Sequence, residues 1–425
     1  MIIILGAGIS GISAGYHLNL NGRKAVIYEK NDSWGGLCDN FNVGKFKFDN
    51  AIHLSFTDNK DVKDLFSKST NFFTYKPDVT SYYKGTWLKH PSQNNLFPLP
   101  IEEKIKIIKS FINRKKNINK NIKNYEEWLR YQYGNYFAEN FPMKYSKKYW
   151  TIDSKKLTIC WIKNRMYKPI IDEVLKGAMT SNTPNSYYAN EMRYPKKGGY
   201  KSFLNFMAKK CDIRLNKKTI LIDTKKKKVF FEDGSSTSYS HLISSIPLPE
   251  LVTMIKNVPN NIIKASQNLS WTSMALVSLG LNKPNIPKSL WFYIYDENFL
   301  ASRAYSPSMK SKDNVPKGCS SLQFEFYFSK YKKINITKKR LINHVIKKSI
   351  EIGLFKKEDI IIQDCKIVDY ANVIFDHNFK KNKQKIHKYL DSIGISYIGR
   401  FGEWDYLWSD QSLISGKKIA ENLVF

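Results

Sequence analysis

The first thirty residues carry two short apolar runs, separated by a glycine-rich turn and a stretch that favours a helix. Residues 2–5 and residues 25–28 are apolar throughout, which is typical of strands that are buried on both faces of a parallel sheet. Residues 12–18, between them, favour a helix. The order strand, turn, helix, strand predicts the start of an α/β domain built on a parallel sheet.

Later segments of the chain predict further strands and two helical regions. Residues 101–131 are predicted to be mostly helical, and residues 337–352 form an amphipathic helix. Strands are expected at residues 220–223, 228–231, 241–247 and 271–281, and within residues 361–379. This pattern predicts an α/β protein in which a second set of strands follows the first domain.

The glycine-rich turn has the spacing of a dinucleotide-binding motif. Gly6 permits the tight turn, Gly8 lets the backbone approach a pyrophosphate, and Gly11 lets the helix pack against the strand. The free N–H groups of the helix N-terminus, near Ser10, then face the phosphates. Glu29, directly after the second strand, can accept both hydroxyls of a ribose and disfavours a 2′-phosphate. FAD or NAD is therefore favoured over NADP, and the alternative is a glycine turn without a ligand.

Composition limits the class of protein. The chain has 425 residues, of which 42% are hydrophobic and 25% charged, as expected for two or three globular domains. No apolar run approaches the roughly 20 residues of a membrane span, and the chain starts with a strand where a signal peptide would need a basic segment. A cytoplasmic protein is expected. The five cysteines are scattered without C-x-x-C spacing, so no metal site is predicted.

The formal net charge of +32 raises the question of an anionic partner. The charge comes from lysines in short runs, in a chain that is rich in lysine, asparagine and isoleucine everywhere. No nucleic-acid-binding motif accompanies it, so no nucleic-acid partner is predicted. Steering of an anionic substrate and peripheral association with an anionic membrane stay open, as does the oligomeric state.

A second glycine pair, in Trp34-Gly35-Gly36-Leu37-Cys38, follows the acid. Together with the first motif, it resembles the FAD-binding start of the flavoprotein group that includes amine oxidases, phytoene desaturases, protoporphyrinogen oxidases and UDP-galactopyranose mutases. The resemblance implies that FAD is the cofactor, with NADPH or NADH as a possible reductant. It also implies a Rossmann-like FAD-binding domain interrupted by a mixed or antiparallel sheet and a helical substrate domain.

Further blocks are similar to eukaryotic-type UDP-galactopyranose mutases in particular. They are the phenylalanine-aspartate segment that ends at His53, residues 87–100 with their Gln-Asn-Asn trio, the segment around Arg165, the segment around Arg303, and residues 396–423. The division implied is residues 1–75, 201–265 and 386–425 for the FAD-binding domain, 76–200 for the helical and sheet substrate-binding insertion, and 266–385 for the substrate-binding sheet.

The same resemblance implies roles for individual residues. Catalytic roles are implied for His53, Arg165 and Arg303. Cofactor contacts are implied for Gly6, Gly8, Ser10, Gly11, Glu29, Gly36, Leu37, Arg400, Tyr406 and Gln411. Substrate contacts are implied for His90, Gln93, Asn95, Tyr145, Trp150, Arg165, Tyr293, Arg303, Tyr305, Tyr406 and Asp410. For Tyr145 and Trp150 a place in the core is an equal alternative, and His53 could be a loop histidine without a role.

This sequence also departs from the mutase pattern. His90 stands where those enzymes have tyrosine, Asp410 replaces an asparagine, and Ile52 stands in a flavin loop that usually contains glycine. An acid at position 410 would repel a diphosphate or select a different hydroxyl pattern of the sugar. Together with Phe379, which stands about where the mutases have a tyrosine, these positions count against the mutase function.

Three functions follow as hypotheses. The first is an FAD-dependent nucleotide-sugar mutase of surface-polysaccharide synthesis, which by resemblance interconverts pyranose and furanose through attack of the reduced flavin N5 on the anomeric carbon. The second is an oxidoreductase of the amine oxidase type that acts on a sugar or amine. The third is a binding or scaffold flavoprotein in polysaccharide assembly. In the first case the partner is a nucleoside-diphosphate sugar.

Overall fold

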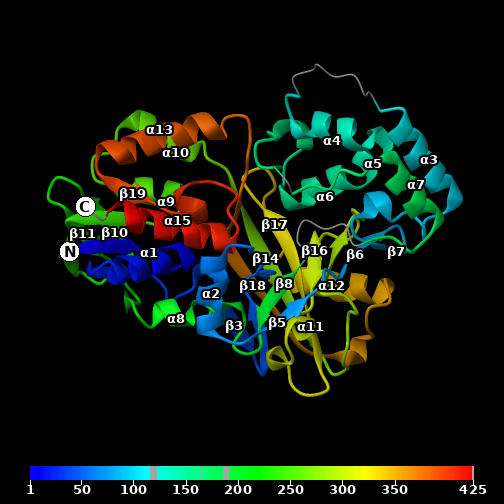
Figure 1. The fold of residues 1–425 in the computed structure, drawn as a ribbon, viewed down its shortest axis with the longest axis horizontal. Coiled ribbons are helices and arrows are strands. Elements are labelled where there is room, and N and C mark those ends of the chain that lie inside the picture. Colours follow the sequence, from blue (N-terminus) through cyan, green and yellow to red (C-terminus); the bar gives the residue numbers. More distant parts are fainter. Residues whose placement is uncertain (115–121, 164, 185–190, 424–425) are drawn as a thin grey trace.

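A five-stranded parallel sheet forms one end of the molecule, at the left in Figure 1. The computed structural model describes residues 1–114, 122–163, 165–184 and 191–423. The strand order is β19 (Ile395–Tyr397), β13 (His241–Ser244), β1 (Ile2–Leu5), β2 (Ala25–Tyr28) and β9 (Asp212–Arg214), with every neighbouring pair parallel. The predicted strands at residues 2–5 and 25–28 are confirmed, and three distant parts of the chain complete their sheet.

Helices bury both faces of this sheet. Ile2 and Ile4 point into an apolar cluster with α1 (Ile9–Leu20) and α15 (Ser409–Asn422), whereas Ile3 and Leu5 point into the main core. That core includes residues of α9 (Leu248–Met254), α10 (Asn260–Gln267) and α13 (Phe379–Ser392), and of the antiparallel strands β10 (Thr219–Asp223) and β11 (Lys228–Phe231), which β12 (Ser236–Ser238) extends. Burial on both faces explains why these strands are apolar throughout.

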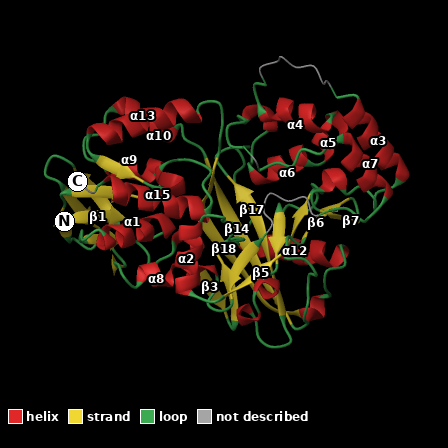
Figure 2. Cartoon of the chain, viewed as in Figure 1, coloured by secondary structure: helices red, strands yellow, loops and turns green. Residues whose placement is uncertain are grey.

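A larger, seven-stranded sheet forms the centre of the molecule (Figure 2). Its order is β18 (Ile360–Val373), β14 (Trp271–Leu281), β17 (Ser320–Phe328), β16 (Arg303–Tyr305), β15 (Trp291–Ile294), β6 (Val79–Tyr83) and β7 (Thr86–Lys89). Only the pair β15 and β6 is parallel. The amphipathic helix predicted at residues 337–352 is confirmed as α12 (Lys338–Glu351), which packs on β14 and β18.

A helical part covers the other end, at the upper right in Figure 1. Its helices are α3 (Ile101–Ile112), α4 (Tyr125–Tyr133), α5 (Asn135–Asn140), α6 (Pro142–Tyr149) and α7 (Ile171–Met179). The helical region predicted at residues 101–131 is therefore divided. Helix α3 ends at Ile112, and α4 starts anew behind Asn124, whose side chain accepts a hydrogen bond from the Glu127 N–H.

Short elements join these parts. Strands β3 (Asn40–Val43) and β4 (Phe46–Asp49) form one hairpin, and β5 (Phe72–Tyr75) pairs with β8 (Met192–Pro195). The remaining α-helices are α2 (Lys60–Ser69), α8 (Asn205–Ala208), α11 (Pro307–Lys310) and α14 (Gly399–Gly402). Among the described residues, no helix has the length and apolar character needed to cross a membrane.

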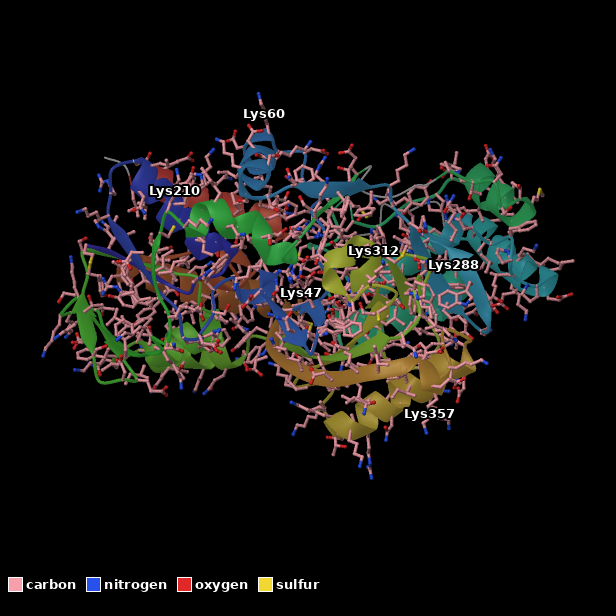
Figure 3. All side chains as sticks on the ribbon, turned by 90° about the horizontal axis from the view of Figure 1, so that it is seen from below. Lys47, Lys60, Lys210, Lys288, Lys312 and Lys357 are labelled. Atoms are coloured by element: carbon pink, nitrogen blue, oxygen red, sulfur yellow. The ribbon has the colours of Figure 1, made fainter. Side chains whose placement is uncertain are left out.

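The positive charge is spread over the molecule. Figure 3 shows labelled lysines distributed across one face, from Lys210 and Lys60 near the parallel sheet to Lys288 at the far side, with Lys312 and Lys357 between and below them. All five are exposed. A distributed charge favours general attraction of anions over one built anionic-partner surface.

A buried ion pair links β4 to α11, the short helix between β16 and β17. Lys310 Nζ lies 2.6 Å from Asp49 Oδ2, and both side chains are at most 1% exposed. The same carboxylate accepts hydrogen bonds from the Tyr194 hydroxyl (2.8 Å) and the Tyr200 N–H (3.0 Å), while the Asp49 carbonyl accepts one from the Tyr305 hydroxyl (3.2 Å). Burial lowers the pKa of Lys310, and Asp49 opposes that shift. Asp49 thus connects three segments that are distant in sequence: β4, residues 194–200 and residues 305–310.

Replacement of Lys310 by methionine tests how much this ion pair contributes to the stability of the fold. Lys310→Met leaves the Asp49 carboxylate buried without its counterion, so we expect a loss of about 3–5 kcal/mol in the free energy of unfolding, measured with urea. Lys218→Met is the matched control, because Lys218 pairs with Glu232 on the surface and its loss costs at most about 1 kcal/mol. Equal stability of the two variants would contradict the assignment.

Candidate functional site

A single cavity of about 1040 Å³ runs from the glycine turn of the parallel sheet to the helical part. At one end its wall is formed by the glycine turn after β1 and by Glu29, and at the other by side chains of α6 and of the seven-stranded sheet. The segment before α15 and the first turn of that helix close one side through Tyr406, Trp408 and Asp410. The cavity therefore brings together residues from the first fifty and the last thirty positions of the chain.

The two glycine segments form a cradle at the first end. A Cβ atom on Gly8 would meet nothing within 4 Å, so open space lies in front of this residue. In contrast, a Cβ on Gly11 would lie 2.0 Å from the Gly6 carbonyl oxygen, and Gly11 serves helix packing. Gly36 lies against Gly8, where a Cβ would come within 3.2 Å of the Gly8 Cα. The arrangement leaves room for a pyrophosphate directly against the backbone.

Glu29 ends β2 at the wall of the cavity. Its Oε1 accepts hydrogen bonds from the Asn31 N–H (3.0 Å) and side-chain amide (2.8 Å), and its Oε2 accepts one from the Ala7 N–H (2.8 Å). These donors fix the orientation of a buried carboxylate. A carboxylate has about four lone-pair sites, so one is left for a ribose hydroxyl.

Residues from the C-terminal block complete this end. Arg400 lines the cavity, and its guanidinium is fixed by the carbonyl groups of Leu407 (2.9 Å) and Ala371 (3.1 Å). Ser10 and Leu37 also line it. Gln411 has a different place: its Oε1 accepts a hydrogen bond from the Trp408 N–H (2.9 Å) and caps α15.

Two histidines in the cavity wall are neutral. His53 Nδ1 lies 3.1 Å from the Ala51 carbonyl oxygen, which can only accept, so Nδ1 carries the proton and Nε2 is an acceptor. Burial lowers the pKa of His53 to about 4 and that of His90 to about 3. The His90 ring packs against Tyr293 at 4.7 Å. Neither imidazole adds positive charge to the cavity at neutral pH.

Arg303 is held by a carboxylate in the adjacent strand. Arg303 Nε lies 2.5 Å from Oε2 of Glu325, which is fully buried and is its register partner across β16 and β17. The Tyr327 hydroxyl donates to the same oxygen (2.5 Å), and the Ile52 N–H donates to Oε1 (2.9 Å). Although burial opposes the charge, Glu325 and nearby tyrosines hold the pKa of Arg303 well above its usual value.

Arg165 lies on the other side of a tyrosine pair. Its guanidinium packs on the rings of Tyr406 (4.6 Å) and Trp408 (4.8 Å), and Nη2 donates to the Tyr406 carbonyl oxygen (2.6 Å). The Tyr406 hydroxyl is 3.0 Å from that of Tyr149, and Arg303 lies 5.4 Å above the Tyr149 ring. The two arginines thus flank the Tyr149–Tyr406 pair.

Aromatic side chains form the remaining wall at this end. The Tyr145 ring stacks on Tyr149 at 5.5 Å and meets Tyr293 edge-on at 5.3 Å. Trp150 lines the cavity but is only 2% exposed, and it packs against Tyr406. Tyr145 and Tyr293 thus offer larger accessible faces than Trp150 for a flat group.

Two expected substrate residues lie behind the wall. The Asn95 side-chain amide donates to the Pro91 carbonyl (2.7 Å), and its oxygen accepts from the Thr183 hydroxyl, so Asn95 shapes the loop. Tyr305 is fully buried and bonded to Asp49. Gln93 does line the cavity, with its amide donating to the Tyr167 carbonyl (3.2 Å).

Sequence reasoning missed four polar residues of this region: Tyr149, Tyr327, Asn372 and Glu325. Glu325 carries a detectable signal, because it is the only charged position in the strand 320–328. Tyr149 follows Tyr145 by four residues and so shares its helix face.

Comparisons with known proteins identify the cofactor. Residues 9–347 match the family described as flavin containing amine oxidoreductase, which is four fifths of the chain. The cofactor is therefore FAD, in agreement with the open space at Gly8, the approach of Gly36 and the position of Glu29.

Solved structures share the whole fold. A crystal structure of reduced UDP-galactopyranose mutase matches all of this chain and 93% of its own, with a TM-score of 0.94 and 24% identity. A putative protoporphyrinogen oxidase from Exiguobacterium sp. 255-15 (TM-score 0.76, 13% identity) and a putrescine oxidase variant (0.68, 14%) each match all of this chain and 98% of their own. At these identities the similarity concerns the fold.

Substitution of Gly8 tests the FAD cradle. A valine at Gly8 would project into open space and its φ of −74° suits any residue, so the fold should tolerate it. The side chain would occupy the place of the FAD diphosphate, and we expect Gly8→Val to lower the flavin bound per protein by about tenfold or more. Flavin absorbance measures the content, and circular dichroism of the same sample reports the fold. Full flavin content in the variant would exclude Gly8 from the diphosphate site.

Proposed function

Because this chain belongs to the flavin containing amine oxidoreductase family, we propose that it is an FAD-dependent nucleotide-sugar mutase, which interconverts the pyranose and furanose forms of a nucleoside-diphosphate sugar. One observation carries the proposal: Arg165 and Arg303 flank the Tyr149–Tyr406 pair in the cavity that also holds the FAD cradle. Two guanidinium groups suit two phosphates, since their planar forks match phosphate oxygens.

The electrostatics of the cavity favour an anionic substrate over an amine. Both histidines are neutral, and Arg303 is charged, with its counterion Glu325 fully buried beside it. A substrate ammonium group would meet two guanidinium groups, whereas a diphosphate would be attracted to them. The neighbouring aromatic faces of Tyr145 and Tyr293 suit the base or the sugar.

Each residue then has a defined task. When bound and reduced, FAD supplies the nucleophile for the anomeric carbon of the sugar. Arg165 and Arg303 bind the diphosphate and stabilise the charge that develops on it as it leaves. The Tyr149 and Tyr406 hydroxyls lie between them and can donate to the same oxygens. The aromatic wall excludes water from the open sugar, so positioning and charge stabilisation are the protein's main contributions.

Asp410 favours a second candidate. This carboxylate lines the cavity in the first turn of α15 and could pair with a substrate amine or a sugar hydroxyl. The second candidate is therefore an FAD-dependent oxidoreductase that acts on an amine or a sugar, with NADH or NADPH as possible electron donors in either case.

Product analysis separates the two candidates. We expect the dithionite-reduced holoenzyme to convert UDP-galactopyranose, or another UDP- or dTDP-sugar, into its furanose isomer, detected by chromatography and NMR. The air-oxidised enzyme is the control and should be inactive. Oxygen or NADPH consumption with an amine or sugar, without any isomer from the sugar nucleotides, would instead establish the oxidoreductase.

Binding of UDP tests the two arginines directly. We expect Arg165→Ala and Arg303→Ala each to raise the Kd for UDP by about tenfold or more, because each removes a charge-assisted hydrogen bond worth about 1.5–3 kcal/mol. Both variants should retain FAD. Arg340→Ala, at an exposed position of α12, is the control. Calorimetry gives the affinity, and loss of flavin in place of UDP binding would assign the arginine to the cofactor.

A further inference from the structure

The ammonium group of Lys148 lies inside the protein, within the loop that joins β15 to β16. The residue is 6% exposed and extends from α6. Its Nζ donates hydrogen bonds to four backbone carbonyl oxygens, those of Ile294 (2.8 Å), Asp296 (2.7 Å), Phe299 (2.8 Å) and Ala301 (3.1 Å).

Four convergent carbonyl oxygens are the environment that proteins build for a monovalent cation. Carbonyl oxygens only accept, so the central nitrogen has to donate to all of them. An ammonium group has three N–H donors, so two of the four oxygens share one donor, whereas a neutral amine has two donors and a lone pair that would face an oxygen. Burial lowers the pKa of Lys148 to about 7, and the nearby charge of Asp296 opposes that shift. Without a cation, the four oxygens would repel one another.

The loop closed by Lys148 is flanked on both sides by residues that line the cavity. Strand β15 contributes Tyr293 before the loop, and β16 begins with Arg303 after it. The helix that carries Lys148 contributes Tyr145 and Tyr149. Across this junction Tyr145 meets Tyr293 at 5.3 Å, and Arg303 lies 5.4 Å above the Tyr149 ring.

We propose that Lys148 is a positioning residue whose ammonium group acts as a built-in monovalent cation: it closes the loop 295–302 and fixes α6 against β15 and β16. In this role it holds the Tyr149 ring against Arg303 and so shapes the site for the substrate diphosphate. The effect on nucleotide binding rests on the proposed function, whereas the requirement for a cation in the loop does not.

The chain provides a matched control one helical turn away. Lys144, on the same helix, pairs with Glu297 of the same loop at 3.2 Å, but the two side chains are 29% and 60% exposed. An exposed ion pair of this kind contributes at most about 1 kcal/mol. Lys144→Ala therefore removes a lysine between the same two segments without emptying the carbonyl cage.

Chemical rescue tests the proposal in the FAD-loaded enzyme. Lys148→Ala deletes three carbons and the ammonium group, which propylammonium replaces atom for atom. We expect Lys148→Ala to lower the Tm and to raise the Kd for UDP by about tenfold, the effect of losing about 1.4 kcal/mol. Excess propylammonium should restore both, whereas tetramethylammonium at equal ionic strength, which cannot donate a hydrogen bond, should restore neither. Lys144→Ala should resemble the unmodified enzyme.

The outcomes distinguish the two proposals. An unchanged Tm in Lys148→Ala, or equal rescue by both cations, would overturn the role of Lys148. If the unmodified enzyme does not bind UDP, the proposed function fails. Rescue of the Tm alone then still tests whether the loop 295–302 requires a cation. Should Lys148→Ala not fold, Lys148→Arg and Lys148→Met replace it. Arginine keeps a charged donor and should retain more stability than methionine, and the reverse order would overturn the proposal.

Discussion

The buried carboxylate of Glu325 is the interaction on which the arrangement of the site depends. It accepts hydrogen bonds from the Ile52 N–H, from Arg303 and from the Tyr327 hydroxyl, and it is fully removed from solvent. A buried carboxylate is costly unless it is paired, so these donors have to be in place together. The segment before His53, on the cofactor side, and the arginine on the substrate side are thereby fixed as one unit. Glu325 also neutralises Arg303 from behind and leaves its accessible face to an anion.

Two further buried charges follow the same principle. Asp49 with Lys310 anchors the strand that precedes the histidine segment, and Lys148 anchors the helix that carries the tyrosines. Each joins segments that lie more than one hundred residues apart. Apolar packing alone lets sheets and helices shift relative to one another at little cost in free energy. A buried charge with three or four defined partners is satisfied in only one relative position of those elements. In this protein, the exposed lysines give the net charge, and the few buried charges set the geometry.

Local patterns made the parallel sheet and the FAD cradle predictable. The apolar runs, the glycine spacing and the acid at Glu29 lie within thirty residues, and each has a physical reason that does not require the rest of the chain. The non-local partners were not predictable: nothing next to Glu325 in sequence points to Ile52. For Asn95 and Tyr305, the sequence motifs correctly placed the residues close to the site. The motifs did not show whether each side chain faces the cavity or the core. The prediction that residues 101–131 are mostly helical is confirmed by α3 and α4, but the helical pattern did not reveal where the cap at Asn124 starts the second helix.

The fold itself does not decide the reaction. Proteins that share it include a mutase, a putative protoporphyrinogen oxidase and amine oxidases. Possible substrates differ in the charge that they would bring to the end of the cavity remote from the FAD cradle. Here that end carries Arg165 and Arg303 around a tyrosine pair, while Asp410 lies at the start of α15. A substrate that carries a diphosphate at one end and hydroxyl groups at the other would satisfy both features at once. A simple amine would bring a further positive charge next to the two guanidinium groups, and this repulsion is the physical reason to prefer the nucleotide sugar.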